Sequence, residues 1–243
     1  MKSEIKTIRA ELEKLTAPER VKWALETFVI KDIVIASSLG LEDQALTHMA
    51  LAVSKDARIV TLDTGRNFQS VYDLMQETME RYGFCYEVYF PDYREVEEMV
   101  RARGPNLFYE SVENRKLCCR IRKIEPLKRA LSTARAWICG LRRDQSITRS
   151  GAEPVEFDET FGIVKFNPLY DWTAEQVREY ISENNIPYNR QHDAGYESIG
   201  CEPCTRPVRG GEDIRSGRWW WETPEKRECG LHLKPAGRND GQN

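Results

Sequence analysis

The sequence lacks the features that mark membrane-spanning and secreted proteins. No apolar run in its 243 residues approaches the length of about 18 residues that a membrane helix needs. Residues 1–6 are polar and have no apolar segment typical of a signal peptide. The chain also has no internal repeat and no low-complexity tract. These absences predict a cytoplasmic protein without membrane contact.

The composition is that of a folded protein, with 40% hydrophobic and 31% charged residues. The length suits one large α/β domain, or such a domain with an appendage. Seven cysteines are present, an odd number that includes one adjacent pair. In a reducing compartment this pattern indicates a metal site, a cluster or a reactive thiol rather than a disulfide framework.

The net charge of −3 hides a strong asymmetry. Residues 115–149 contain eleven Lys or Arg and two acids, a charge of +9, so the rest of the chain carries −12. An acidic chain with one cationic stretch is a poor general binder of nucleic acids and a better binder of a small polyanion. A solvated basic helix is the simpler alternative.

Short apolar runs alternate with helical patterns through most of the chain. After a helical stretch of about thirty residues, in which Pro18 opens a second segment, strand patterns occupy 32–36, 57–62, 85–90 and 134–139. Helical patterns lie between them at 41–53, 67–82 and 92–103. This order predicts a doubly wound, mainly parallel sheet, in which ligands bind beyond the carboxyl ends of the strands.

The same pattern divides the chain into three parts. We expect an N-terminal helical segment (1–30), a nucleotide-binding α/β domain (31–186) and a C-terminal appendage (187–243). The appendage contains five of the eleven prolines and little periodicity, which predicts that something other than a large core holds it in place.

Three unusual segments follow predicted strands and should therefore meet in one crevice. In 37–43, small residues such as Ser37, Ser38 and Gly40 allow backbone N–H groups to approach an anion. Residues 62–66, which begin at Leu62, offer an acidic group, a hydroxyl and a glycine turn (Asp63, Thr64 and Gly65) that suit contacts with ribose or adenine. Either segment alone is equally well explained as a capped turn.

The third strand-end segment, 140–149, contains adjacent arginines. Arg142 and Arg143 can each form the two parallel hydrogen bonds that phosphate or sulfate oxygens accept. An exposed surface loop would explain their charge but not their position after a strand.

Four cysteines form two pairs, Cys118-Cys119, which we expect at a helix start, and Cys201-x-x-Cys204. Side chains of adjacent residues diverge, so both pairs reach one centre only if that centre is large, which favours a [4Fe–4S] cluster over a tetrahedral zinc. Lys123 follows Cys118 by five residues and could place a cation near such a cluster. Two unrelated pairs of buried thiols are the alternative.

The remaining cysteines differ from one another in context. Cys229 lies in a glycine-containing tail, where nearby cations would activate it as a thiolate nucleophile, although an inert cysteine is plausible from this residue alone. Cys85 and Cys139 lie in strand patterns and are expected in the core. The run 219–221 of three tryptophans could clamp the tail near the cluster or form a contact between copies of the chain.

Taken together, these motifs resemble assimilatory adenylyl-sulfate (APS) reductases, the iron–sulfur type of the PAPS/APS reductase family. The matching segments are Ser37-Ser38-Leu39-Gly40-Leu41-Glu42-Asp43, Leu62-Asp63-Thr64-Gly65-Arg66, Cys118-Cys119-Arg120-Ile121-Arg122-Lys123, Gly140-Leu141-Arg142-Arg143-Asp144-Gln145-Ser146 and Glu228-Cys229-Gly230-Leu231-His232. The resemblance implies a fold like that of the adenine-nucleotide alpha hydrolases. Relatives that reduce phosphoadenylyl sulfate (PAPS) lack the four cluster cysteines.

The resemblance also implies a mechanism. The Cys229 thiolate would attack the sulfur of APS, AMP would leave, and thioredoxin would release sulfite from the resulting S-sulfocysteine, a step of sulfate assimilation toward cysteine. Cys118, Cys119, Cys201 and Cys204 would bind a [4Fe–4S] cluster that orders the site. Substrate contacts would come from Ser37, Ser38, Gly40, Glu42, Asp43, Leu62, Asp63, Gly65, Lys123, Arg142, Arg143 and His232.

Two alternatives stay open at this stage. The chain could also accept PAPS, or it could be a zinc-stapled module for adenylate binding or tRNA thiolation in which Cys229 is incidental. The sequence does not determine the oligomeric state, and a homo-oligomer is possible.

Overall fold

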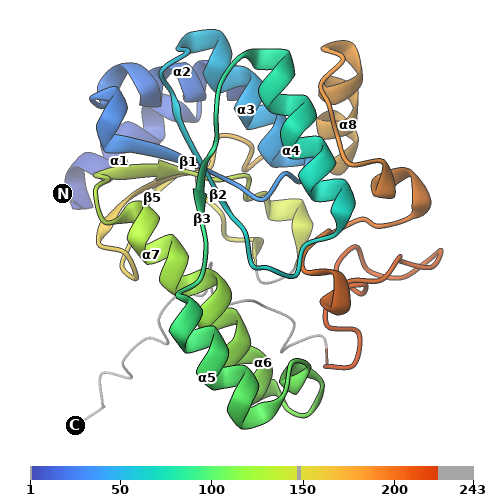
Figure 1. The fold of residues 1–243 in the computed structure, drawn as a ribbon. Coiled ribbons are helices and arrows are strands. Elements are labelled where there is room, and N and C mark those ends of the chain that lie inside the picture. The colour runs from blue at the N-terminus through green and yellow to red at the C-terminus, as the bar shows by residue number, and fades with distance from the viewer. Residues whose placement is uncertain (1, 147–148, 224–243) are drawn as a thin grey trace, which may run out of the picture.

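The computed structural model describes residues 2–146 and 149–223, which form a twisted sheet with helices on both faces (Figure 1). The six strands are Ile33–Ser37 (β1), Arg58–Leu62 (β2), Glu87–Tyr89 (β3), Ala136–Ile138 (β4), Val155–Asp158 (β5) and Ile163–Phe166 (β6). The helices are Lys2–Leu12 (α1), Ala17–Thr27 (α2), Leu41–Val53 (α3), Gln69–Tyr82 (α4), Tyr93–Arg103 (α5), Val112–Cys119 (α6), Glu125–Leu131 (α7) and Ala174–Glu183 (α8).

The strand order β3-β2-β1-β4-β6-β5 confirms the predicted doubly wound, mainly parallel sheet. All neighbouring strands are parallel except β5, which runs antiparallel to β6 at one edge. The chain continues from β1 to β2 on one side and reaches β4 on the other. The crevice between the carboxyl ends of β1 and β4 is therefore the place where this topology binds ligands.

Both faces of the sheet are buried, which explains why its central strands are continuous apolar runs. Ile33 and Ile35 of β1 pack into the larger core with α1, α2 and α3. Val34, between them, points to the other face and joins a second core with Trp137 and α7. The alternation of side chains along a strand thus divides one apolar segment between two cores.

The N-terminal helices share the larger core with the sheet. Leu12 of α1 and Val21 of α2 are fully buried in it, and Pro18 lies in the first turn of α2, as predicted. The Arg20 side chain donates to the Asp171 carboxylate at 2.7 Å and further ties α2 to the segment before α8. The division of the chain at residues 30 and 186 stays a prediction.

A third, smaller core lies where α5 and α6 meet the C-terminal segment. It contains Cys119, Cys201, Cys204 and Trp219 together with apolar side chains of residues 99–121. Cys118 and Cys119 end α6, so our expectation that this pair lies at a helix start is wrong. Ser111 caps α6 seven residues before Cys118 by accepting from the Asn114 N–H at 3.1 Å.

Two further expectations have different outcomes. Cys139 is buried directly after β4, as predicted, whereas Cys85 is exposed in the connection before β3. Cys85 escapes burial because β3, the edge strand, covers only residues 87–89 of the predicted 85–90. No helix among the described residues is long and apolar enough to cross a membrane.

Candidate active site

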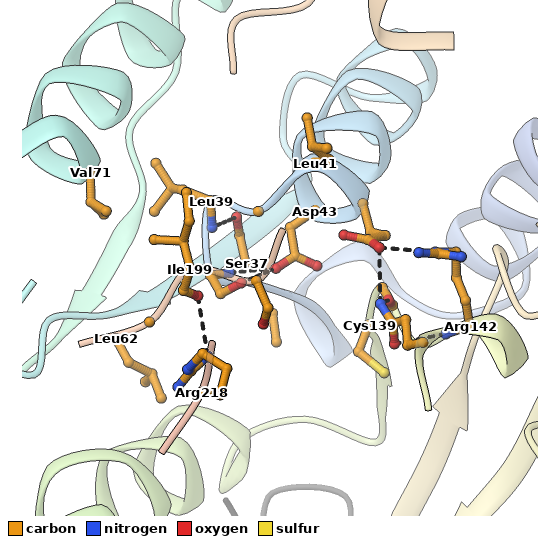
Figure 2. A pocket seen from close by; sticks show the side chains of 18 of the residues that line it. Ser37, Leu39, Leu41, Asp43, Leu62, Val71, Cys139, Arg142, Ile199 and Arg218 are labelled. Atoms are coloured by element: carbon orange, nitrogen blue, oxygen red, sulfur yellow. Dashed lines mark hydrogen bonds and ion pairs between the residues drawn. The ribbon is translucent and has the colours of Figure 1, made fainter. Parts of the chain in front are cut away.

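A cavity of about 260 Å³ opens at the carboxyl ends of β1, β2 and β4 (Figure 2). All three segments that were predicted to converge contribute to its lining, among them Ser37, Leu62 and Arg142. The predicted convergence is therefore confirmed, and it results from the parallel topology, because parallel strands end at the same edge of the sheet.

The turn between β1 and α3 is held by a carboxylate from its own chain. Asp43 accepts from the Ser38 N–H at 2.6 Å and from the Ser38 hydroxyl at 2.7 Å, and the Ser37 hydroxyl accepts from the Leu39 N–H at 3.2 Å. Two of the N–H groups of this turn, those of Ser38 and Leu39, thus have partners within the turn itself. Burial raises the pKa of Asp43 to about 6, although both bonds from Ser38 favour the ionised form.

Gly140 brings the end of β4 against the start of α3. A Cβ at this position would lie 2.6 Å from Asp43 Oδ1 and 2.7 Å from Glu42 Cβ, so only glycine fits without displacing α3. Gly140 therefore fixes the width of the crevice at its floor.

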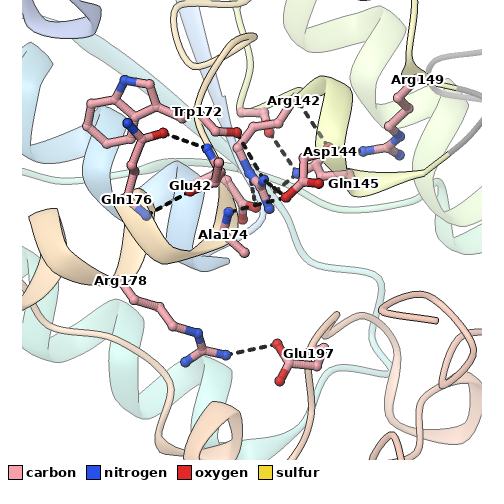
Figure 3. A network of polar contacts seen from close by, with 12 residues as sticks. Glu42, Arg142, Asp144, Gln145, Arg149, Trp172, Ala174, Gln176, Arg178 and Glu197 are labelled. Carbon is pink, nitrogen blue, oxygen red and sulfur yellow. Dashed lines mark hydrogen bonds and ion pairs between the residues drawn. The ribbon is translucent and has the colours of Figure 1, made fainter. Parts of the chain in front are cut away.

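Arg142 and Glu42 form the centre of a polar network beside the cavity (Figure 3). Arg142, only 3% exposed, donates through Nε to Glu42 Oε1 at 2.9 Å, and the Gln145 amide donates to the same oxygen at 3.0 Å. Burial alone would raise the pKa of Glu42, but Arg142 and Gln145 outweigh it and hold this pKa below its usual value. The Arg142 guanidinium thus lines the cavity while neutralising a carboxylate of its own chain.

The structure places Arg143 outside the cavity. Its Nε donates to the Ala152 carbonyl at 2.7 Å, and its guanidinium lies 4.7 Å from the centre of the Tyr170 ring. Adjacent side chains point in different directions here, so only one of the two predicted arginines faces the ligand site. The expected contact between Arg143 and an anion has no support in this geometry.

Asp63 and Gly65 are likewise absent from the described lining of the cavity. Asp63 accepts from the Gly65 N–H at 2.7 Å and from the Tyr72 hydroxyl at 2.9 Å, and Gly65 has a positive φ of 68°. This is the capped turn that was the alternative to a nucleotide contact. Leu62 and Gly40, in contrast, do line the cavity.

Four cations that our sequence analysis did not single out also line the cavity. They are Arg149, Arg178, Arg215 and Arg218, and they join the predicted Lys123. The Arg218 guanidinium lies 4.7 Å from the Trp219 ring centre and occupies the space that a Cβ at Gly200 would need. The available signal was a pair of arginines three residues apart just before the tryptophan run.

His192 is a further lining residue that our sequence analysis missed. It is 5% exposed, and neither ring nitrogen has a hydrogen-bond partner within the described part of the chain. Burial lowers its pKa, so the ring is neutral near pH 7 and offers one donor and one acceptor. No local pattern in the sequence distinguishes this histidine from a core residue.

The four predicted cluster cysteines line a second, smaller cavity. Cys118 and Cys119 come from the end of α6, and Cys201 and Cys204 from the C-terminal segment. The chain passes from α6 into a π-helical turn, Arg120–Ile124, in which positions five apart share a face. This turn places Lys123 on the side of Cys118 and in the lining of both cavities.

Cations surround the four cysteines in the second cavity. Arg115, Arg122, Lys123 and Arg218 line it together with the cysteines. Burial alone would raise the pKa of Cys201, yet Lys123, the Thr64 hydroxyl and Arg218 outweigh it and lower this pKa. At Cys118 and Cys204 burial dominates instead: it raises the pKa of Cys118 and brings that of Cys204 to about 12. Four thiols in a cationic lining, three of them buried and Cys118 partly buried, fit a group with net negative charge, such as an iron–sulfur cluster.

The arrangement does not suit a single ion. Among the described residues, no group of three or more cysteine, histidine, aspartate or glutamate side chains could hold one metal ion.

The two cavities share a wall. Lys123, Arg218 and Trp219 line both of them. The loop after β2 adds a direct connection, because Thr64 lines the first cavity and its hydroxyl hydrogen-bonds the Cys201 thiol at 3.3 Å. Cys229 and His232, the predicted nucleophile and its neighbour, lie outside the described residues.

Comparison with known proteins agrees with this geometry. Residues 32–207 match the model of the phosphoadenosine phosphosulfate reductase domain, which covers β1 to the second cysteine pair. The chain belongs to this family. A protein named adenosine 5'-phosphosulfate reductase from Sinorhizobium fredii (strain USDA 257) is 44% identical over 237 residues, 97% of this chain and 93% of the relative. A protein of the same name from Burkholderia cepacia is 48% identical over 83% of this chain and 80% of its own length.

Solved structures of related fold include another member of the family. The phosphoadenylyl-sulfate (PAPS) reductase of Candida auris, crystallised with phosphate, superposes with a TM-score of 0.72 at 29% identity, over 86% of this chain and 98% of its own. The FMN adenylyltransferase of Candida glabrata superposes with a TM-score of 0.56 over 94% of this chain and 78% of its own, but at 15% identity it shows a shared fold only.

Proposed function

We propose that this chain reduces adenylyl sulfate to sulfite and AMP in the assimilation of sulfate toward cysteine. The observation that carries the proposal is the wall of Lys123 and Arg218 between the cavity at the strand ends and the cavity of four thiols. The names of the bacterial relatives at 43–48% identity support the same reaction. We also propose that the enzyme acts in the cytoplasm with thioredoxin as its reductant.

In the proposed complex the adenylyl group lies at the ends of β1 and β2, between the turn of Ser37 and Leu62. The phosphosulfate points toward Lys123, Arg149, Arg215 and Arg218. Charge-assisted hydrogen bonds from these cations would stabilise the phosphosulfate oxygens and the charge that grows on the leaving phosphate. Arg142 contributes by holding Glu42 and the loop after β4 in place.

The chemistry is two displacements at sulfur. The Cys229 thiolate attacks the sulfonyl sulfur, an S–S bond forms, the S–O bond to phosphate breaks, and AMP leaves with the electron pair. A thioredoxin thiolate then attacks Cys229 Sγ, and sulfite leaves with the electron pair of the S–S bond. The second thioredoxin thiol resolves the mixed disulfide, so thioredoxin is oxidised and Cys229 returns to its thiol.

A [4Fe–4S] cluster held by Cys118, Cys119, Cys201 and Cys204 would supply an electrostatic centre behind this wall, not an electron carrier. Hydrogen bonds within the chain hold the cationic wall and the thiol cavity in fixed positions relative to the loop after β2. Arg122 donates to the Thr64 carbonyl at 2.6 Å, and the Glu202 N–H donates to the Arg66 carbonyl at 2.8 Å. Both bonds join the thiol cavity to the loop after β2.

Mass spectrometry tests the proposal. Wild-type protein mixed with APS and no reductant should gain one SO₃ group on Cys229, and Cys229→Ser should gain none while it keeps its iron and its affinity for AMP. Cys85→Ser, which replaces an exposed thiol, is the matched control and should gain the group as wild type does. An adduct that persists in Cys229→Ser would contradict the assignment.

PAPS is the second candidate substrate, because the Candida auris relative is named a PAPS reductase. Sulfite release measured with thioredoxin, from APS and from PAPS in parallel, separates the two. We expect faster release from APS, in line with the names of the relatives that are 43–48% identical to this chain over the aligned residues.

A further inference from the structure

A fully buried ion pair joins the helix that bears the first thiol pair to the last described residues of the chain. Arg115 lies in α6, three and four residues before Cys118 and Cys119, and is 0% exposed. Its Nε and Nη2 donate to the two carboxylate oxygens of Glu222 at 2.8 and 2.7 Å. The pair is therefore bidentate, the most directional form that such a contact takes.

Aromatic and thiol groups enclose the Arg115 guanidinium. It lies 4.7 Å from the centre of the Trp219 ring, and the Glu222 N–H donates to the Trp219 carbonyl at 2.8 Å, which closes a turn. Burial alone would lower the pKa of Arg115, but the hydrogen bond with Glu222 and the proximity of Cys119 raise it. One cation thus contacts a cluster cysteine on one side and the end of the described chain on the other.

A buried ion pair contributes little to the free energy of folding, but it fixes the relative position of the two segments that it joins. Removing two charges from water costs about as much as their attraction returns, whereas their geometry admits one arrangement. A similar pair, Arg206 and Glu212, forms two hydrogen bonds of 2.9 and 3.0 Å in the same C-terminal segment. The side chains of this second pair are about a third exposed, so the pair constrains the position of the chain less than Arg115 and Glu222 do.

The position of Glu222 matters because this residue precedes Cys229 closely in the chain. The two are seven residues apart, and seven residues span at most about 25 Å when fully extended. The point at which Glu222 is held therefore limits where the Cys229 thiol can be. We infer that Arg115 and Glu222 are positioning residues: they fix the point from which the chain continues toward Cys229. The inference rests on the proposed function, in which Cys229 is the nucleophile.

The test measures the rate at which APS sulfonates Cys229 in a single turnover, by quenched-flow mass spectrometry of the iron-loaded protein. Glu222→Gln keeps the shape of the side chain and removes its charge. We expect the sulfonation rate to fall at least tenfold, while iron content and the affinity for AMP stay within twofold of wild type. Neither Arg115 nor Glu222 is among the described residues that line the cavity at the carboxyl ends of β1, β2 and β4. Glu212→Gln is the matched control and should change none of the three measurements.

A second variant separates position from stability. Arg115→Met with Glu222→Met replaces the pair by apolar side chains, which commonly restores folding. If the double variant binds iron as wild type does but sulfonates slowly, the inference stands. A wild-type sulfonation rate in Glu222→Gln or in the double variant would overturn it, and so would loss of iron in both, because the pair would then only support the thiol cavity.

The outcomes also distinguish the inference from the proposed function. If wild-type protein forms no adduct with APS, the proposed reaction fails. If wild type forms the adduct and Glu222→Gln forms it equally fast, only the positioning role of the pair fails.

Discussion

The sheet region and the thiol region of this molecule are stabilised in different ways. In the sheet, apolar side chains fill both faces, and Ile33, Val34 and Ile35 of β1 are 0% exposed. In the thiol region a small core holds three cysteines, and four charged groups are buried beside it: Arg115, Arg122, Arg218 and Glu222. The sheet region therefore depends on apolar area, and the thiol region on buried charges, thiols and, in the proposed function, the cluster that they would bind.

This difference indicates which part of the site is rigid and which part can lose its structure while the rest stays folded. The turn of Ser38 and the loop of Gly140 rest on strands with a large core behind them. The wall of Lys123 and Arg218 rests on the thiol region, whose own apolar core is small. Changes in the second region should thus remove activity before they unfold the first.

The largest effect is expected from substitutions that disrupt the thiol region alone. Replacing any one of Cys118, Cys119, Cys201 or Cys204 by alanine should remove the iron and reduce sulfite release below about 1% of wild type, because binding energy for a metal group is folding energy for the segment that binds it. Iron analysis, an activity assay and limited proteolysis check this. Proteolysis should reach residues 199–222 first and leave the sheet region intact.

Cys139→Ala is the control within the sheet region, since this buried thiol donates to Asn167 Oδ1 at 3.1 Å and lies outside the described lining of the thiol cavity. It should keep its iron. Full iron content in any of the four cluster-cysteine variants would contradict the assignment of that residue.

The next effect probes the polar network of the sheet region. Arg142→Met leaves the Glu42 carboxylate beside the cavity without its guanidinium and should lower the free energy of unfolding by about 4 kcal/mol, the usual cost of breaking a buried pair. Urea denaturation measures the loss. Adding Glu42→Gln to Arg142→Met should recover most of it, and failure to recover would show that Arg142 acts mainly through other contacts.

A third effect concerns pH. Because burial raises the folded-state pKa of Asp43 to about 6 from an ordinary value of 3.8, the folded state binds the proton more tightly than the unfolded state. The stability linked to this proton is fully present below pH 3.8 and is lost as the pH rises through 6. A shift of this size corresponds to about 3 kcal/mol.

Asp43→Asn removes this titration and keeps an oxygen that can accept from Ser38. Relative to wild type, the variant should therefore be more stable at about pH 7.5 than at about pH 4 by about 3 kcal/mol. Urea denaturation at both pH values gives the difference. A difference that does not change with pH would show that Asp43 titrates normally in the folded protein.

The smallest effect sharpens the contrast between neighbouring arginines. Arg143→Ala removes a half-exposed side chain that packs on Tyr170 outside the cavity, so it should cost less than about 1 kcal/mol of stability. The affinity for AMP and for APS should stay unchanged in equilibrium binding. A tenfold weaker affinity for APS would return Arg143 to the substrate site.

Much of the sheet region was predictable from local pattern. Runs such as Ile33-Val34-Ile35 are apolar throughout because both faces of a parallel sheet are buried, and this pattern is visible without a structure. The convergence of 37–43, 62–66 and 140–149 was predictable from topology alone. The four cysteines, paired in the sequence, line one cavity, while the single large centre that their spacing predicts stays a prediction.

The sequence by itself therefore determined the fold class, the edge of the sheet at which the site lies and the four thiols that meet. Only the tertiary structure decided which side chains face the cavity. Arg142 faces it and Arg143 does not, Cys85 is exposed while Cys139 is buried, and Arg218 reaches the site from a segment without periodicity. The physical reason is that the direction of a charged side chain depends on its contacts with distant segments, such as Glu42 for Arg142 and Glu222 for Arg115, which no local pattern encodes.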